Sequence, residues 1–257
     1  MIQSLWSGFC TAFSMYSILP VPPARWHKDS MRYAFCFFPL VGVAVMLPAL
    51  LWQHLTFRYK ISSGLFAAVA TLLPLVMSGG IHMDGFLDTV DALSSHAAQE
   101  KKLEIMSDPH MGAFGVMGCG LYLLLSFGLW SQVYATPRLM LFPTVGYVLS
   151  RSLSGWGVVH FPCAKTSGLN YFFSGGASRL GASLCCGGGA VLSLGFLLWL
   201  EPFWGAINAI LCFGYVAVHK RMAMREFGGN TGDLSGFLSQ NIELLTLLVA
   251  AIGGIVS

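Results

Sequence analysis

The sequence predicts an all-α fold, that of a polytopic helical integral membrane protein with about seven transmembrane helices. Of the 257 residues, 55% are hydrophobic and only 10% are charged, and the mean hydropathy is +0.69. A helix needs about 20 mostly apolar residues to cross the roughly 30 Å of hydrocarbon in a bilayer. Seven stretches approach or exceed this length, and none shows the alternation typical of barrel strands. They are residues 33–53, 61–81, 112–137, 139–161, 180–200, 202–218 and 234–257.

The chain shows no internal repeat, low-complexity tract or soluble linker, so we expect residues 1–257 to form a single membrane-embedded domain. Residues 5–20 hold Trp6, Phe9 and Phe13 on no single clean face. Whether this segment crosses the membrane or lies on it stays open. It lacks a charged start followed by a small-residue cleavage site, so we do not expect a signal peptide.

The positive charges predict which side of the membrane the loops face. The loops that fall on one side of the seven stretches carry ten of the fourteen Lys and Arg residues. The loops on the other side carry only Arg58, Lys60 and Arg138. The positive-inside rule makes the ten-charge side cytoplasmic. We therefore expect a multi-pass protein of the cytoplasmic (inner) membrane whose active-site loops face the cytoplasm. The ten-charge loops are residues 1–32, 81–111, 162–179 and 219–233.

The most specific motif is the run Gly-Gly-Ile-His-Met-Asp-Gly-Phe-Leu-Asp-Thr-Val-Asp, which begins at Gly79. At about 100° per residue, Asp84, Asp88 and Asp91 fall within roughly 60° of arc on one helical stripe. Three carboxylates repel one another unless a cation lies among them, and carboxylate oxygens together with substrate phosphates suit Mg²⁺. The stripe predicts a Mg²⁺ site in which the three aspartates are metal ligands and catalytic residues. The alternative is a solvated acidic face.

His82 precedes this stripe and would point away from the acids on a continuous helix. The Gly79-Gly80 pair before it could break the helix and turn the imidazole back toward them. We count His82 among the candidate catalytic residues, with three roles open: general base, phosphate contact or capping residue.

Asp108 and His110 lie just before the next apolar stretch. Asp followed by Pro predicts a helix N-cap with Pro109 in the first turn. The exposed N–H groups of such a helix start, near Lys101 and Lys102, would also help to hold a phosphate. Both interpretations stay open, and Asp108 and His110 are candidate phosphate-binding residues.

A basic cluster and a glycine-rich turn follow the sixth apolar stretch. Backbone amides of such a turn can approach a phosphate closely, and neighbouring basic side chains neutralise it. Any turn between helices can be rich in glycine, so the turn matters because it shares a face with the acids. The residues expected to contact phosphate or nucleotide are Lys220, Arg221, Asn230, Thr231 and Asp233.

Arg151 is the only basic residue well inside a predicted span. A charge at that depth is costly and usually faces a polar cavity or a partner. We expect a substrate-binding or ion-pair role for Arg151, with snorkelling to the interface as the alternative. Acids for a metal, cations for phosphate and a glycine-rich turn on one face together predict transfer of a phosphoryl-linked group.

These motifs resemble those of the cobalamin synthases, also called adenosylcobinamide-GDP ribazoletransferases, over nearly the whole chain. The resemblance rests on Leu-Pro-Val-Pro from Leu19, the long acidic run from Gly79, Glu-Ile-Met-x-Asp from Glu104 and Thr-Gly-Asp from Thr231. It implies a Mg²⁺-dependent membrane enzyme that joins α-ribazole, or its 5′-phosphate, to adenosylcobinamide-GDP and releases GMP. This reaction would complete the lower nucleotide loop of cobalamin.

Two positions depart from the pattern of that family. Pro109 and His110 stand where a basic Arg is common, and Gln240 stands where a Glu is often seen. A neutral His is a weaker phosphate partner than Arg, so the contribution of this segment to phosphate binding is reduced. The acidic run itself is intact.

The resemblance also implies the partners. It predicts small corrinoid and nucleoside substrates, a lipid membrane and no nucleic acid, and it allows a homo-oligomer and contacts with other enzymes of corrinoid assembly. The alternatives are another Mg²⁺-dependent intramembrane transferase that acts on a diphosphate, either a prenyltransferase or a CDP-alcohol phosphotransferase, or an ion-coupled transporter. A prenyltransferase usually shows two separate acidic motifs, and only one is convincing here. A CDP-alcohol phosphotransferase needs an Ala-Arg pair where Leu87-Asp88 stands. Transporters are usually built from repeated halves, which this sequence lacks.

Overall fold

Helices form nearly all the regular structure of this computed structural model, which describes residues 2–22, 32–164 and 178–256. Within these ranges the only β-type pairing is an isolated bridge between Cys163 and Asn230. The all-α prediction is therefore confirmed. The elements are α1 (Ile2–Tyr16), η1 (Ala34–Cys36), α3 (Phe38–Arg58), α4 (Ser63–Met77), α5 (Ile81–Ser94), α6 (Gln99–Ile105), α7 (Ala113–Val133), α8 (Leu141–His160), α10 (Arg179–Leu200), α11 (Pro202–Phe227) and α12 (Gly232–Val256).

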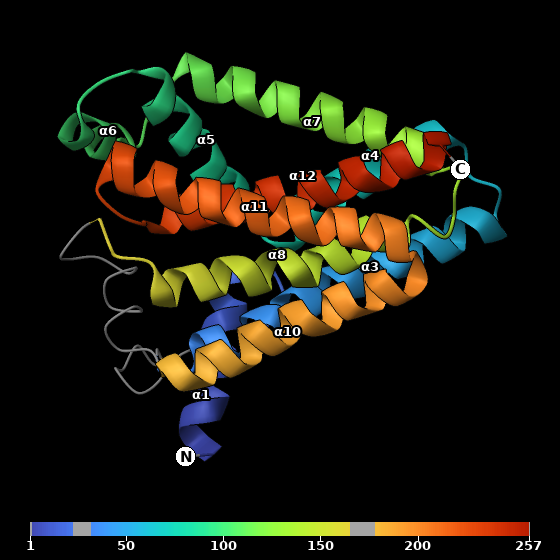
Figure 1. The fold of residues 1–257 in the computed structure, drawn as a ribbon, viewed down its shortest axis with the longest axis horizontal. Coiled ribbons are helices and arrows are strands. Elements are labelled where there is room, and N and C mark those ends of the chain that lie inside the picture. Colours follow the sequence, from blue (N-terminus) through green and yellow to red (C-terminus); the bar gives the residue numbers. More distant parts are fainter. Residues whose placement is uncertain (1, 23–31, 165–177, 257) are drawn as a thin grey trace.

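The long helices run side by side around α8, which is buried along nearly its whole length (Figure 1). Helices α3, α10 and α12 pack directly against α8. The short helices α5 and α6 lie together at one end of the bundle, where α7 begins (Figure 1). This end collects the segments that carry the acidic run and the glycine-rich turn.

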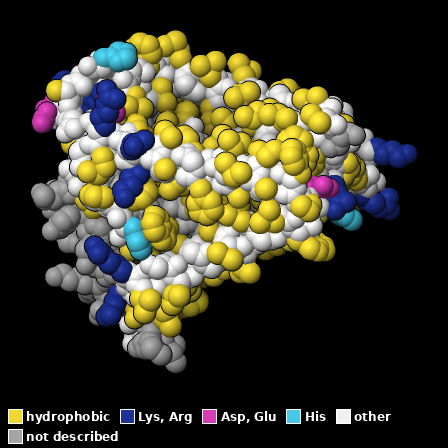
Figure 2. All heavy atoms as spheres, in the orientation of Figure 1, with side chains coloured by type: hydrophobic (Ala, Val, Ile, Leu, Met, Phe, Trp, Pro, Cys, Tyr) yellow, Lys and Arg dark blue, Asp and Glu magenta, His cyan; other side chains and the backbone are white. Residues whose placement is uncertain are grey.

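Apolar side chains cover the middle of the visible face, whereas Lys and Arg gather toward its two ends (Figure 2). This distribution is that of a multi-pass membrane protein, because the hydrocarbon layer excludes charge between two polar surfaces. Five described helices are long and apolar enough to cross a bilayer, and the bent pair α4 and α5 would make a sixth. The five are α3, α7, α10, α11 and α12.

The expected count of about seven is approximate because α8, at the centre of the bundle, is less apolar than the other long helices. Its buried residues include Ser150, Arg151, Ser152 and Ser154. These side chains face protein rather than lipid, so α8 needs little apolar surface. Helix α1 has 15 residues, fewer than the roughly 20 that a span requires.

The second predicted span ends earlier than its apolar sequence suggests. Helix α4 stops at Met77, and α5 leaves it at an angle of 93°. Gly79 and Gly80 form the bend with φ values of +64° and +81°, a region that side chains with a Cβ rarely adopt. Helix α5 therefore leaves the direction of the long helices and packs at the end of the bundle where α6 and the start of α7 lie.

Candidate active site

Helix α5 presents the acidic stripe on one side, as the spacing predicts. Asp84 is exposed, while Asp88 and Asp91 are half-buried. The opposite side of the helix carries buried apolar residues, including Met83 and Phe86, which pack toward Tyr122 of α7. The amphipathic pattern therefore turns the carboxylates toward the polar end of the bundle.

A glycine allows α5 to approach the start of α12. A Cβ placed on Gly85 would lie 2.7 Å from the Cα of Asp233 and 2.8 Å from its carbonyl oxygen, which is closer than any real side chain tolerates. This contact brings Asp233, in the first turn of α12, beside the stripe. Asp233 was expected to contact nucleotide, and the structure adds it to the acidic group.

The four carboxylates interact most strongly at Asp88. Burial raises its pKa, and the nearby charges of Asp84, Asp233 and Asp91 raise it further, from 3.8 to about 7. Each neighbour disfavours the charged form of Asp88, as expected when like charges share a site. Raised pKa values of this kind are characteristic of functional sites, where a cation or substrate later offsets the repulsion.

Asp91 has a role that the stripe did not predict, because its carboxylate caps α7. One oxygen accepts a hydrogen bond from the backbone N–H of Gly112 at 2.8 Å, and the other accepts one from Gly115 at 2.9 Å. A side chain on either glycine would collide with this carboxylate. Asp91 thus places a negative charge at the positive end of the α7 dipole, a favourable position for an acid.

The expectation that Asp108 is the N-cap of this helix is wrong. Helix α7 begins at Ala113 with Gly112 as its N-cap, so Pro109 lies before the first turn. Asp108 instead accepts a 2.9 Å hydrogen bond from the backbone N–H of His110 and lies 2.8 Å from His110 Nδ1. Both side chains are exposed at the same end of the molecule as the stripe.

His82 lies on the face of α5 turned away from the acids. The glycine bend precedes Ile81, so His82 is already in the regular helix and takes the direction that the helix dictates. Its ring stacks on Tyr16 with centroids 5.7 Å apart and meets Phe38 edge-on at 5.9 Å. His82 is 3% exposed, and this position suits packing against α1 and α3.

In the glycine-rich turn, Asn230 and Thr231 are buried and hold the backbone. The Thr231 hydroxyl accepts a hydrogen bond from Leu234 N–H at 3.1 Å, which caps α12. Asn230 donates its side-chain amide to the Ser235 hydroxyl at 2.9 Å, and its backbone N–H donates to Pro162 at 2.7 Å. The turn therefore fixes where α12 starts and so where Asp233 points.

The expected basic residues divide into paired and open groups. Lys102 is buried and forms an ion pair with Glu226, which ties α6 to the end of α11, and the exposed Lys101 pairs with Glu104 at 2.8 Å. Lys220 and Arg221 are exposed near the same end of α11. The Lys220 ammonium lies 5.5 Å from the centroid of the Phe161 ring. Lys220 and Arg221 are therefore the exposed members of this set, while Lys102 is engaged in holding α6.

Arg151 lies in the bundle interior, where it pairs with Glu243 of α12. Ser150 completes the group, since its hydroxyl lies 2.8 Å from Arg151 Nη1 and donates to the Glu243 carboxylate at 3.1 Å. Arg151 is fully buried, so snorkelling to an interface does not occur. The two charges are the only ones inside the predicted spans, and the structure joins them as an ion pair.

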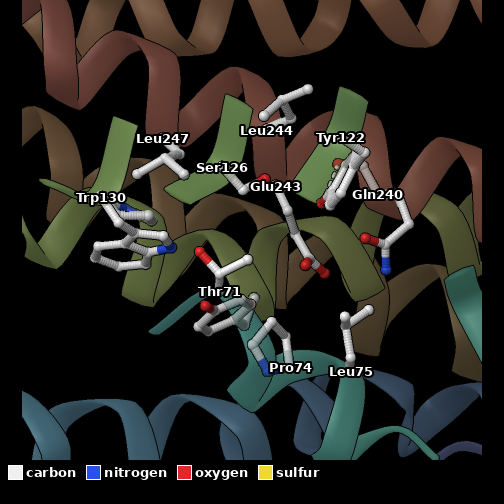
Figure 3. Close-up of a pocket in the computed structure, with 12 residues that line it drawn as sticks. Thr71, Pro74, Leu75, Tyr122, Ser126, Trp130, Gln240, Glu243, Leu244 and Leu247 are labelled. Atoms are coloured by element: carbon white, nitrogen blue, oxygen red, sulfur yellow. Dashed lines mark hydrogen bonds between the residues drawn. The ribbon is translucent and has the colours of Figure 1, made fainter. Parts of the chain in front are cut away.

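A narrow cavity of about 20 Å³ lies beside this ion pair (Figure 3). Glu243 and Gln240 reach its wall from α12, Tyr122 reaches it from α7 and Thr71 from α4 (Figure 3). Its size and polar lining suit a single water molecule. The cavity is far too small for either expected substrate, so it supports helix packing.

The carboxylates of the stripe fit a divalent metal, although within the described ranges no three His, Cys, Asp or Glu side chains form a ready ligand set. Mg²⁺ commonly binds through one or two carboxylates and completes its shell with water and substrate phosphates. Asp91 uses both oxygens to cap α7. The excess negative charge around Asp88 is what a divalent ion would offset, and Asp84, Asp88 and Asp233 are candidate donors beside Asp91, whose oxygens each accept one hydrogen bond.

The fold and this site define an α-helical multi-pass membrane protein with an acidic group at one polar end. The chain belongs to the cobalamin-5-phosphate synthase family, which it matches over residues 8–251. This finding confirms the resemblance that the motifs indicated.

Curated relatives extend the similarity over nearly the whole chain. An adenosylcobinamide-GDP ribazoletransferase from Lachnoclostridium phytofermentans is 39% identical over 254 residues, 98% of this chain and 94% of the relative. A protein of the same name from Desulfitobacterium hafniense is 34% identical over 97% of this chain and 96% of the relative. Another from Sinorhizobium medicae is 29% identical and covers 96% of each chain. No solved structure matches.

Proposed function

We propose that this protein transfers the adenosylcobinamide phosphate group from adenosylcobinamide-GDP to α-ribazole, or to α-ribazole 5′-phosphate, and releases GMP. The observation that carries the proposal is the similarity, over almost the full length of both chains, to relatives named for this transfer. The site adds chemical support. Its carboxylates suit a metal-bound diphosphate, and Lys220 and Arg221 are exposed near the same end of the bundle.

The reaction needs one bond to phosphorus to form and one to break. A ribose hydroxyl oxygen of the acceptor attacks the phosphorus attached to the cobinamide arm, GMP leaves with the electron pair, and the hydroxyl proton passes to a carboxylate of the stripe. Asp84, Asp88 and Asp233 would hold Mg²⁺, which neutralises the diphosphate when bound. Asp91 positions α7 and α5 relative to each other through its two hydrogen bonds.

We further propose that the protein lies in the inner membrane and that this site is on its cytoplasmic side. The charge bias of the loops supports this orientation, because ten of the fourteen Lys and Arg residues lie on the side of the acids. Three of these ten, Arg25, Lys28 and Lys165, lie outside the described residues.

The test uses purified full-length protein in lipid nanodiscs with adenosylcobinamide-GDP, α-ribazole and Mg²⁺. We expect GMP release that stops when EDTA removes the metal and resumes when Mg²⁺ is restored. Intact, folded protein that releases no GMP would reject the proposed transfer. GMP release that is insensitive to EDTA would reject the metal assignment alone.

A further inference from the structure

A groove opens at the bend between α4 and α5, directly beside the acidic stripe. Its volume is about 490 Å³, within the range of small-molecule sites. Among the residues that the structure describes, the wall consists of the apolar side chains of Leu75, Ile81, Met83 and Leu87, and Asp84 is the only ionisable group on it. Gly79 and Gly80 also line the groove and leave this part of the wall free of side chains.

The glycine bend keeps the groove open. No heavy atom lies within 4 Å of the position that a Cβ on Gly80 would occupy, so any side chain there would enter open space. The backbone N–H groups of both glycines are already used, by Val76 and Leu75 carbonyls at 3.1 and 2.9 Å. The described side chains around the groove therefore offer a ligand apolar carbon on its sides and a single carboxylate at the edge.

This lining distinguishes between the two bases that the proposed reaction brings to the site. Guanine carries several acceptors and donors along its edge, and among the described residues Asp84 is the one polar side chain on the groove wall, which can pair with the donors but not with the acceptors. An acceptor buried without a partner costs about 1–3 kcal/mol. The dimethylbenzimidazole base of α-ribazole is flat, has a single ring-nitrogen acceptor and no exocyclic polar group, and presents two methyl groups to apolar side chains, so it leaves fewer polar atoms to pair than guanine does. The corrin macrocycle with its side chains is larger than the groove.

The spacing along α5 then places the sugar. Asp84 stands one turn after Gly80, whose carbonyl accepts the Asp84 N–H at 2.9 Å, and Asp88 stands one turn further. One helical turn rises about 5.4 Å, close to the width of a pentose. A nucleoside with its base in the groove would set ribose hydroxyls at Asp84 and aim them toward Asp88 and Asp233, where the diphosphate is expected.

We propose that the groove at the α4–α5 bend binds the base of the nucleoside acceptor, with Asp84 accepting a hydrogen bond from its ribose. This inference rests on the proposed function, because it names the binding position of one of the two substrates. It makes Leu75, Ile81, Met83 and Leu87 specificity residues for an apolar base. Leu75 lies before the acidic run, and Ile81, Met83 and Leu87 are apolar positions within it.

The experiment fills the groove and measures binding without turnover. Ile81 is 39% exposed on the wall, so Ile81→Trp adds bulk with little effect on the core. The matched control is Leu72→Trp, since Leu72 is exposed on α4 and does not line the groove. Full-length wild type and both variants in nanodiscs are titrated calorimetrically with α-ribazole and, separately, with GMP. Wild-type GMP release is measured in parallel.

We expect Ile81→Trp to weaken α-ribazole binding at least about tenfold, with GMP binding changed less than about twofold and the Leu72 variant like wild type. On wild-type protein, the riboside without the two ring methyl groups should bind roughly tenfold more weakly, because each methyl buries apolar surface. This ligand comparison does not depend on how well a variant folds.

Two results would overturn the groove assignment. Unchanged α-ribazole affinity in Ile81→Trp would show that the groove holds something else, such as a lipid acyl chain. Loss of GMP affinity in Ile81→Trp with α-ribazole affinity unchanged would show that the groove binds guanine. If wild-type protein releases GMP in either case, the proposed function stands and only the groove assignment fails. If wild type neither binds α-ribazole nor releases GMP, the proposed function fails as well.

Discussion

Replacing Asp88 with Asn should stabilise the metal-free protein and abolish its transferase activity. Burial and the charges of Asp84, Asp233 and Asp91 raise the pKa of Asp88 from 3.8 to about 7. A rise of this size corresponds to at most about 4 kcal/mol against the charged form. Because Asp88 is only half-buried, solvent screening reduces this to about 1–2 kcal/mol. Asn keeps the shape of the side chain and removes the charge, so the Asp88→Asn variant should gain that amount at pH 8.

The sign of the effect follows from where the proton binds. The pKa of folded Asp88 lies above its unfolded value, so the folded state holds an extra proton between about pH 4 and pH 7. The penalty is absent below this range, grows as pH rises through it, and is complete above about pH 7. The stability advantage of Asp88→Asn should therefore be present at pH 8 and nearly vanish by pH 4.

Thermal unfolding in detergent with EDTA, followed by a thiol-reactive fluorogenic dye, measures this difference. Cys10, Cys186 and Cys212 are buried and become reactive when the bundle opens. Added Mg²⁺ should raise the melting temperature of the wild type more than that of Asp88→Asn, because only the folded site binds the ion. Glu100→Gln, at an exposed position on α6, is the matched control. A lower melting temperature for Asp88→Asn at pH 8, or an equal response of both proteins to Mg²⁺, would refute the reasoning.

Three further predictions concern the Asp91 cap, the buried ion pair and the orientation of the protein in the membrane. Asp91→Ala should destabilise the fold by about 3 kcal/mol, since two hydrogen bonds to a charged carboxylate are lost at the start of α7, and a normal melting temperature would contradict the capping role. Arg151→Met or Glu243→Gln alone should lower the free energy of unfolding by about 3–5 kcal/mol, because each leaves one buried charge unpaired. The double variant should recover much of this loss. A double variant as unstable as the single variants would exclude charge pairing as the cause. A reporter enzyme fused after Lys102 should be active only in the cytoplasm, and activity outside the cytoplasm would reverse the proposed orientation.

The positions of the long helices could be predicted because length and hydropathy alone identify segments that a bilayer accepts. Each of the seven apolar stretches overlaps a helix of the structure, α3, α4, α7, α8, α10, α11 or α12. The bend after α4 was suggested by Gly79 and Gly80, but its angle of 93° was not predictable. That angle depends on how α5 packs against α12, and packing between distant segments leaves no local pattern in the sequence.

The candidate site could be predicted in part, because helical spacing alone aligns Asp84, Asp88 and Asp91. The cap of α7 could not, since Asp91 lies 21 residues before Gly112 and local reasoning favours the adjacent Asp108. The contact of Asp233 with α5 was also missed, although Gly85 inside the acidic run was a signal for close approach. The pairing of Arg151 with Glu243 left a clearer signal, because these are the only two charges within the predicted spans.

The contact between Gly85 and Asp233 joins a segment from the first half of the chain to its last helix. During synthesis α5 emerges long before α12, so the acidic group stays incomplete until the start of α12 has been made. Until then Arg151 also lacks Glu243, and the polar side of α8 has no cover. A chain that stopped before α12 would hold Arg151 inside the bundle without the carboxylate that pairs with it. The geometry thus makes completion of the acidic group a late event in the folding of the chain.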